Sequence, residues 1–470
     1  MTEYKPPQFF MWSYLFFALP LVVFISMTQP VFYSPDETSH FIRAYQITAG
    51  DLFFVKSEKV TGSGTYTVGS MIDANILKLH DQVMKLYTDR SARLDPVRVE
   101  QLNSFKWGEL VWSSTKNVAI YPPFLYVPQA IGVALGRWVD LSIMQTVRLS
   151  RLLNGVFATV IGAVALMIAC RGKSILFLFL LLPMTLAQFA SAGQDALCMA
   201  LSAVAAAICS RLYNETKPHA NYYILLLGVC LFLISTARPP YAALSLVFCV
   251  LAVSQWQVKK KRNQYLIAFI GTFSAVVVWS LYITLFVSVG FGPEGVSYKE
   301  QIVGVLNAPF GWLAILFHTW LERFDFYLQS FVGNFGYLDT PLPSFYYLFA
   351  RVMMLSIFIW PWMVVDYKQI TKKATVSYVL NSFVILSAMV SVYLVLYVSW
   401  TPLNAQFIDG VQGRYLIPIA FFMSLLSSDH LTKRAHTSPC FSDGILKLML
   451  IAYACINCMV IPWTIAIRYY

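Results

Sequence analysis

Long apolar segments recur along almost the whole chain, and this repetition limits what the chain can fold into more than any other feature. The first, from Phe9 to Pro30, is long enough to cross a bilayer as a helix. Of the 470 residues, 58% are hydrophobic and 12% are charged, whereas soluble domains carry about 25% charged residues. The sequence therefore predicts an all-α polytopic membrane protein. The first segment is too long for a signal-peptide core and lacks a small-x-small cleavage site, so we expect an uncleaved span.

The net charge of +11 follows from basic residues in short polar segments between apolar runs. Such clusters favour the cytoplasmic side of a membrane, so we do not expect a nucleic-acid partner. The three strongest lie at 259–262, at Lys368 with Lys372 and Lys373, and at Lys433-Arg434. Placing all three in the cytoplasm puts residues 291–343 and 400–412 outside.

Alternation from these clusters predicts about eleven spans. The apolar segments counted are 9–30, 147–170, 174–190, 195–212, 220–236, 240–257, 264–290, 344–365, 375–399, 413–428 and the last apolar stretch of the chain. Residues 121–139 would break the alternation if they crossed. Their three prolines and their aromatic residues favour a helix that lies in the outer interface instead.

We expect one membrane domain over residues 1–470. Residues 31–146 form a first outer loop with juxtamembrane helices, and 76–106 are predicted to be helical. An N-terminal helix module follows at 147–290, then an outer loop at 291–343 and C-terminal helices at 344–470. Within the outer loop, the aromatic-rich stretch 310–331 favours the interface over a span. The eight cysteines are expected to serve packing, including the CxxC at Cys455 and Cys458.

The segment from Ser34 to Arg43 concentrates charged groups where the first span meets water. Ser34, Pro35 and Glu37 match a helix start with a capping box. In that helix Asp36, His40 and Arg43 would share one face. Glu37 is either a capping residue or catalytic, whereas Asp36 is not needed for the cap and is the stronger catalytic candidate. His40 and Arg43 are candidates for substrate binding or for a structural role.

Five further candidates lie at predicted outer boundaries. Asp195 opens an Ala-rich span, Arg238 and Tyr241 flank two prolines, and Gln412 and Arg414 open a later span. Two acids at one boundary can hold a nucleophile and accept its proton, or bind a divalent cation, although no third carboxylate is nearby. Arginines outside run against the positive-inside bias, so each either binds an anion such as phosphate or snorkels to lipid headgroups.

Five stretches together resemble a bacterial family of predicted integral membrane proteins within the GT-C glycosyltransferase superfamily. They are Pro35-Asp36-Glu37-x-x-His40-x-x-Arg43-Ala44-Tyr45-Gln46, Tyr121-Pro122-Pro123, Leu182-Pro183-Met184-Thr185 with Asp195-Ala196, Leu338-Asp339-Thr340-Pro341-Leu342-Pro343, and Gln412-Gly413-Arg414-Tyr415. The resemblance implies a GT-C-like helix bundle in the bacterial inner membrane, with a site that faces the periplasm or the cell exterior. It also implies a polyprenyl-phosphate-linked sugar donor and a glycan, lipid or protein acceptor.

By the same resemblance, Asp36 is the catalytic carboxylate and Asp195 the second acidic position, while Arg414, with Arg238, faces the donor phosphate. The expected reaction is sugar transfer with inversion at the anomeric carbon. No cofactor is required, although a divalent metal stays possible. The alternative function is a transporter or flippase for a lipid-linked glycan, which would place charged groups along a path near the midplane.

Overall fold

The computed structural model describes residues 8–54, 57–58, 66–213, 220–288, 296–363, 370–427 and 441–470, and these residues are predominantly helical. The α-helices are α1 (Phe9–Thr28), α2 (Glu37–Thr48), α3 (Ala74–Thr88), α4 (Pro96–Asn103), α5 (Val127–Trp138), α6 (Ile143–Ile168), α7 (Lys173–Leu180), α8 (Pro183–Phe189), α9 (Asp195–Leu212), α10 (Ala220–Ala237), α11 (Val247–Ser254), α12 (Lys259–Tyr282), α13 (Tyr298–Asn307), α14 (Pro309–Val332), α15 (Ser344–Met363), α16 (Lys372–Trp400), α17 (Ile417–Ala420) and α18 (Phe441–Tyr469).

Shorter helical turns and three small β-ladders complete the fold. The turns are η1 (Pro123–Tyr126), η2 (Pro239–Leu246), η3 (Ile283–Val287), η5 (Gly413–Leu416) and η6 (Phe421–Leu426). The ladders are antiparallel pairs: β1 (Ser57–Glu58) with β2 (Tyr66–Thr67), β3 (Gly69–Asp73) with β4 (Leu110–Ser114), and β5 (Asn334–Phe335) with β6 (Thr340–Pro341). In the longest ladder, Gly69 pairs with Ser114 and Asp73 with Leu110.

Among the described residues, seven helices are long and apolar enough to cross a membrane, or eight if a bent pair counts as one span. The seven are α1, α6, α9, α12 with η3, α15, α16 and α18, and the bent pair is α13 with α14. The predicted number of eleven is therefore wrong. Four predicted spans are broken or too short, namely 174–190, 220–236, 240–257 and 413–428.

The physical reasons differ among these four segments. Residues 174–190 divide into α7 and α8 before Pro183, because a proline disfavours helix in the residue before it. The described helix at 221–237 has 17 residues, about 25 Å at 1.5 Å per residue, whereas the hydrocarbon core is about 30 Å thick. Residues 239–254 begin with the η2 turn, and at 413–426 the four-residue α17 lies between η5 and η6.

The first polar loop agrees better with the sequence. The predicted helical stretch 76–106 covers most of α3 and all of α4. Residues 121–139 include η1 and the 12-residue α5, which is too short to span. The stretch 310–331 lies in α14, which meets α13 at 106°. Its position in the membrane interface stays a prediction.

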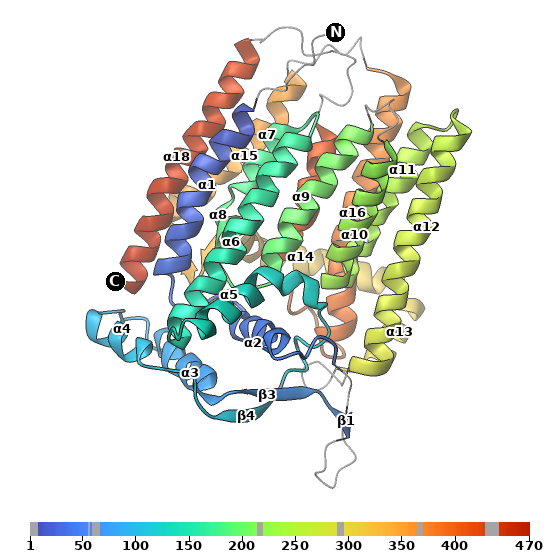
Figure 1. The fold of residues 1–470 in the computed structure, drawn as a ribbon. Helices are drawn as coiled ribbons and strands as arrows, with labels where there is room; N and C mark the ends of the chain where they lie inside the picture. The colour runs from blue at the N-terminus through green and yellow to red at the C-terminus, as the bar shows by residue number, and fades with distance from the viewer. Residues whose placement is uncertain are drawn as a thin grey trace.

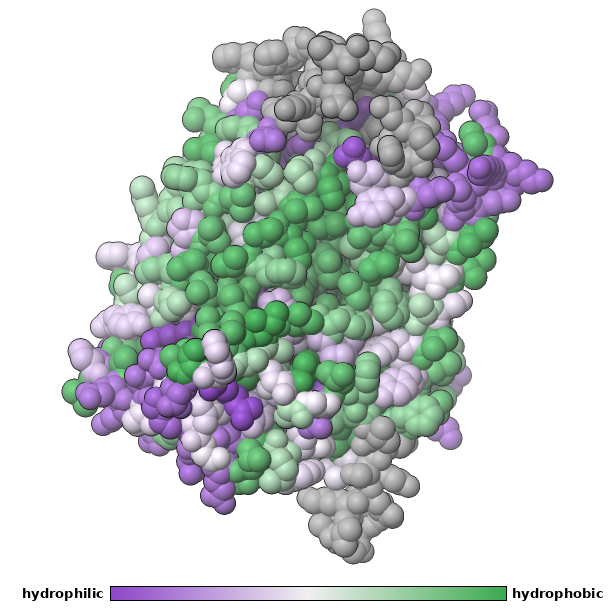
Figure 2. Space-filling view, in the orientation of Figure 1, coloured by the Kyte–Doolittle hydropathy of each residue, from purple (hydrophilic) through white to green (hydrophobic). Residues whose placement is uncertain are grey.

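The long helices run side by side between two ends of the molecule (Figure 1). At one end lie α2, α3, α4, α5 and the β3–β4 ladder, and we call this the site end. A broad hydrophobic band separates more hydrophilic regions near the two ends (Figure 2). Lys259 to Arg262 open α12 and Lys372 and Lys373 open α16, away from the site end. The other predicted basic residues, Lys368, Lys433 and Arg434, lie outside the described residues.

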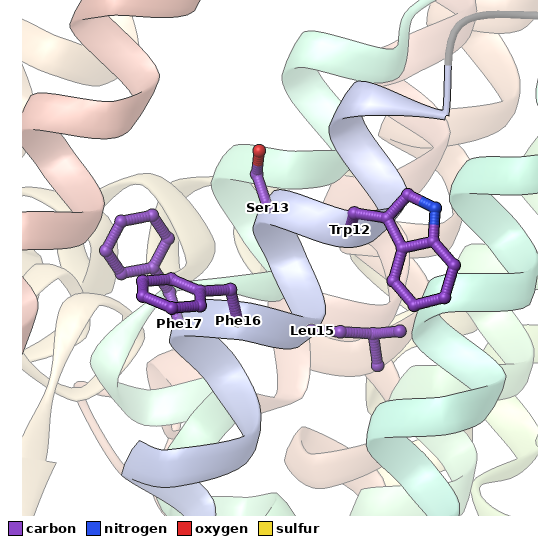
Figure 3. Close-up of a pocket in the computed structure, with 5 residues that line it drawn as sticks. All are labelled: Trp12, Ser13, Leu15, Phe16 and Phe17. Atoms are coloured by element: carbon purple, nitrogen blue, oxygen red, sulfur yellow. The ribbon is translucent and has the colours of Figure 1, made fainter.

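The centre of the bundle is made by α6 and α9, which pack on each other and on α1, α5 and α10. α9 is rich in alanine, and its buried alanines let neighbouring backbones approach closely. On the outer surface, Trp12, Phe16 and Phe17 of α1 line a shallow hollow (Figure 3). The Trp12 and Phe16 side chains there are largely exposed, as expected where a helix faces lipid.

Candidate functional site

Charged residues from four distant parts of the chain meet at the site end. Asp36 precedes α2, Asp195 opens α9, Arg238 precedes η2 and Arg414 lies in η5. Arg414 Nη2 lies 2.9 Å from Asp36 Oδ2, and its Nη1 lies 3.6 Å from Asp195 Oδ2. Arg238 Nη2 lies 3.0 Å from Asp195 Oδ1. The sequence-predicted acids and arginines therefore form one connected cluster.

Arg414 joins the two acids, and its surroundings fix its orientation. Its side chain is only 1% exposed. Nε donates to Gln412 Oε1 at 2.7 Å, and Nη1 donates to Gln188 Oε1 of α8 at 3.4 Å. The preceding residue, Gly413, packs on α14 so closely that a Cβ atom there would lie 2.0 Å from the Tyr327 carbonyl oxygen. Glycine is thus the residue that lets η5 bring Arg414 to the acids.

Asp36 is the most accessible member of the cluster, with a side chain 54% exposed. Its backbone is left-handed, with φ of +63°, which costs a non-glycine residue about 1–2 kcal/mol. Partial burial raises the pKa of the Asp36 carboxyl, but the charges of Arg414 and His40 outweigh burial and leave this pKa below its ordinary value. Asp36 is therefore held as a carboxylate with much of its side chain exposed.

The start of α2 differs from the predicted capping box. The helix begins at Glu37, after Asp36, rather than at Pro35. The Ser34 hydroxyl accepts a hydrogen bond from Gln29 Nε2 instead of capping the helix. Only half of the predicted box forms, because the backbone N–H of Ser34 donates to Glu37 Oε2 at 3.4 Å. The left-handed turn at Asp36 is what separates its side chain from the helix that follows.

Glu37 lies in the interior rather than on the open side of the site. Its carboxylate accepts hydrogen bonds from Arg151 Nε at 2.6 Å and Nη2 at 2.5 Å, and both side chains are fully buried. Arg151 also donates to the carbonyls of Gln29 and Pro30, and the backbone N–H of Ala192 donates to Glu37 Oε1 at 2.9 Å. This ion pair thus ties the segment that carries Asp36 to the segment that leads into Asp195.

His40 and Arg43 separate although they lie on one helix. His40 Nδ1 shares a 2.7 Å hydrogen bond with the Tyr126 hydroxyl. Burial lowers the pKa of His40, although the charges of Asp36 and Asp195 act in the opposite direction. The guanidinium of Arg43 donates to the carbonyls of Asp51, Leu52 and Tyr121. Only His40 therefore shares the electrostatic environment of the acids, while Arg43 holds the backbone of the first polar loop.

Tyr241 and Gln412 support the arginines. The Tyr241 hydroxyl donates to the Tyr415 carbonyl at 2.7 Å, and Gln412 binds Arg414 as described above. The Tyr415 ring lies 4.0 Å from the guanidinium carbon of Arg238, within the range of a cation–π contact. The predicted substrate-binding roles of Tyr241 and Gln412 stay predictions, and their observed contacts are with the protein.

The family model described as "Predicted membrane protein (DUF2142)" matches residues 19–423. The chain belongs to this family. The matched region contains all four charged residues of the cluster, together with Glu37, His40 and Arg151. A search of curated proteins found no match.

Two side chains of this family member that organise the site were missed by the sequence reasoning. Arg151 lies nine residues into α6, and a charged residue within an apolar span is itself a signal of a buried partner or a functional site. Gln188 carries no such signal, because a glutamine in a helix does not by itself indicate a functional site. Within the described parts of the chain, no group of three or more His, Cys, Asp or Glu side chains is placed to hold a metal ion.

Proposed function

We propose that this protein is a GT-C-type glycosyltransferase that moves a sugar from a polyprenyl-phosphate donor to an envelope acceptor on the non-cytoplasmic side of the membrane. The observation that carries the proposal is Arg414, a buried arginine that contacts an accessible carboxylate, Asp36, and a buried one, Asp195. This arrangement puts a proton acceptor next to a cation that can bind phosphate.

In the proposed reaction, an acceptor hydroxyl attacks the anomeric carbon of the donor sugar while Asp36 takes its proton. The bond between the anomeric carbon and the phosphate oxygen breaks, and the leaving lipid phosphate keeps the electron pair. Arg414 stabilises the charge that develops on this phosphate, and Asp195 with Arg238 fixes the position of Arg414. Attack opposite the leaving group gives inversion.

The ion pair between Arg414 and Asp36 suits this sequence of events. In the free enzyme, Arg414 keeps the pKa of Asp36 below its ordinary value. A donor phosphate that binds Arg414 shares this positive charge, so Asp36 becomes a stronger base when the donor is present. The basic ends of α12 and α16 lie away from the site end, and the positive-inside bias then favours a site that faces away from the cytoplasm.

The test uses Asp36→Asn in membranes supplied with a radiolabelled polyprenyl-phosphate sugar and the cell's own envelope fraction. We expect sugar transfer to fall by a factor of at least about 100. The variant should still insert into the membrane and unfold at the same temperature as the unchanged protein. Asp325→Asn is the matched control, because the Asp325 side chain is 80% exposed and pairs with Arg351 rather than with a residue of the cluster. Full transfer by Asp36→Asn would refute the proposal. Movement of an unchanged labelled lipid across reconstituted vesicles would support the flippase alternative.

A further inference from the structure

Two tyrosine rings from distant segments lie together at the site end. Tyr87 belongs to the last turn of α3, and Tyr337 lies between β5 and β6. Their ring centroids are 5.6 Å apart, with planes at 65°. Tyr87 is 44% exposed and Tyr337 is 39% exposed. Both rings belong to segments outside the candidate membrane spans, and each keeps exposed surface that a ligand can contact.

The Tyr337 ring lies within the electrostatic reach of the charged cluster. Burial raises the pKa of the Tyr337 hydroxyl, the negative charge of Asp36 raises it further, and Arg414 opposes this effect. Tyr87 also acts on this hydroxyl. The Tyr33 hydroxyl, three residues before Asp36, donates to the Asp339 carboxylate at 2.9 Å, and this contact joins the loop of Tyr337 to the segment that carries Asp36.

A single arginine fixes both segments that carry the rings. Arg468, near the end of α18, donates from Nη2 to the Leu86 carbonyl at 2.6 Å, one residue before Tyr87. The same nitrogen lies 3.5 Å from Asp339 Oδ2, two residues after Tyr337. Arg468 therefore links the two segments that carry the rings.

The loop that presents Tyr337 is held in a costly conformation. Gly336 and Leu338, on either side of Tyr337, both have positive φ, +63° and +62°. A Cβ atom at Gly336 would lie 2.3 Å from Asp339 Oδ1. Asp339 holds the turn, because its carboxylate accepts the backbone N–H of Tyr337 at 3.1 Å and the Tyr33 hydroxyl at 2.9 Å. A strained, strongly anchored turn that displays an exposed ring is typical of a functional position.

We propose that Tyr87 and Tyr337 bind a sugar unit of the acceptor, so that the acceptor is a glycan rather than a protein or a simple lipid. This inference rests on the proposed transferase function. A pyranose has an apolar face of C–H groups and a rim of hydroxyls, and tyrosine offers a matching apolar ring with a polar tip. A sugar held on these rings would present a hydroxyl towards Asp36.

The test measures binding of a panel of short oligosaccharides, built from hexoses and N-acetylhexosamines, to the full chain in nanodiscs by saturation-transfer NMR. We expect at least one oligosaccharide to bind, and Tyr87→Ala and Tyr337→Ala each to weaken its binding by about tenfold. Tyr337→Phe should keep most of the affinity because the ring remains. The matched control is Tyr222→Ala, which removes a tyrosine 64% exposed on α10, away from the site end. Unfolding temperatures verify that each variant is folded.

The two proposals fail in different ways. If no oligosaccharide binds, or if Tyr87→Ala and Tyr337→Ala bind as the unchanged protein does, the acceptor inference is overturned, whatever Asp36→Asn does to transfer. If Asp36→Asn keeps full transfer but the tyrosine variants lose oligosaccharide binding, the rings bind glycan and the catalytic proposal fails. The ring contact is supported if a folded Tyr337→Ala variant loses oligosaccharide binding while Tyr337→Phe keeps it.

Discussion

Removal of one partner of the buried Glu37–Arg151 ion pair should destabilise this protein strongly. In Glu37→Gln the amide oxygen can still accept the N–H of Ala192, but the guanidinium of Arg151 keeps its charge without a counter-charge. Both side chains are fully buried, and breaking a buried pair in this way costs about 3–5 kcal/mol. Since the same pair holds the segments before Asp36 and Asp195 together, transfer should fall as well.

The matched control is the exposed pair between Asp325 and Arg351, whose atoms lie 3.2 Å apart with side chains 80% and 43% exposed. Asp325→Asn should change the free energy of unfolding by about 0–1 kcal/mol, as exposed pairs do. Equilibrium unfolding in mixed micelles, followed by tryptophan fluorescence, gives both values. The reasoning is refuted if Glu37→Gln costs no more than Asp325→Asn.

Replacement of both partners offers a second comparison. In Glu37→Leu with Arg151→Met neither charge of this pair is left, yet the Gln29 carbonyl and the N–H of Ala192 lose their partners, while the Pro30 carbonyl keeps only the N–H of Tyr33. Each unsatisfied group costs about 1–3 kcal/mol. The double variant should therefore stay clearly less stable than the unchanged protein, and recovery of full stability would mean that these backbone contacts contribute little.

Three further outcomes are expected. Arg414→Lys should lower transfer by about 100-fold in protein that still folds, because one ammonium cannot contact both Asp36 and Asp195; full activity of this variant would show that the two contacts are not needed. Gly413→Ala should cost about 1–3 kcal/mol of unfolding free energy, since its Cβ would meet the backbone of α14, whereas Gly271→Ala, with open space around it, should not destabilise. Burial lowers the pKa of His40, so its contribution to stability is complete above about pH 6.5 and is lost as the pH falls below that value. His40→Gln should reduce the loss of unfolding free energy between about pH 7.5 and 5. His80, whose pKa is also lowered by burial, should account for part of the loss that remains. If His40→Gln leaves the pH dependence of unfolding unchanged, His40 is not the group that causes it.

The candidate site illustrates how far residue patterns reach. Alternation of eleven predicted spans placed Asp36, Asp195, Arg238 and Arg414 at one boundary. The number of spans is wrong, yet the structure brings these four residues together at one end. The same patterns could not say that Arg414 contacts both acids, because pairing depends on how η5 lies against α8 and α14. They also suggested one shared face for Asp36, His40 and Arg43, whereas the left-handed residue at Asp36 and the carbonyls that bind Arg43 separate these groups.

The sequence by itself determined that this is a helical membrane protein and where along the chain its first long polar loop lies. It also determined which charged residues at span boundaries need a partner or a function. These properties follow from hydropathy and from the cost of burying charge, which are local along the chain. The tertiary structure decided how many helices are long enough to span and which acid each arginine meets. It also paired Glu37 with Arg151, 114 residues away. Such pairings depend on the packing of α6 against its neighbours, and no local pattern encodes the distance between two side chains that only the folded bundle brings into contact.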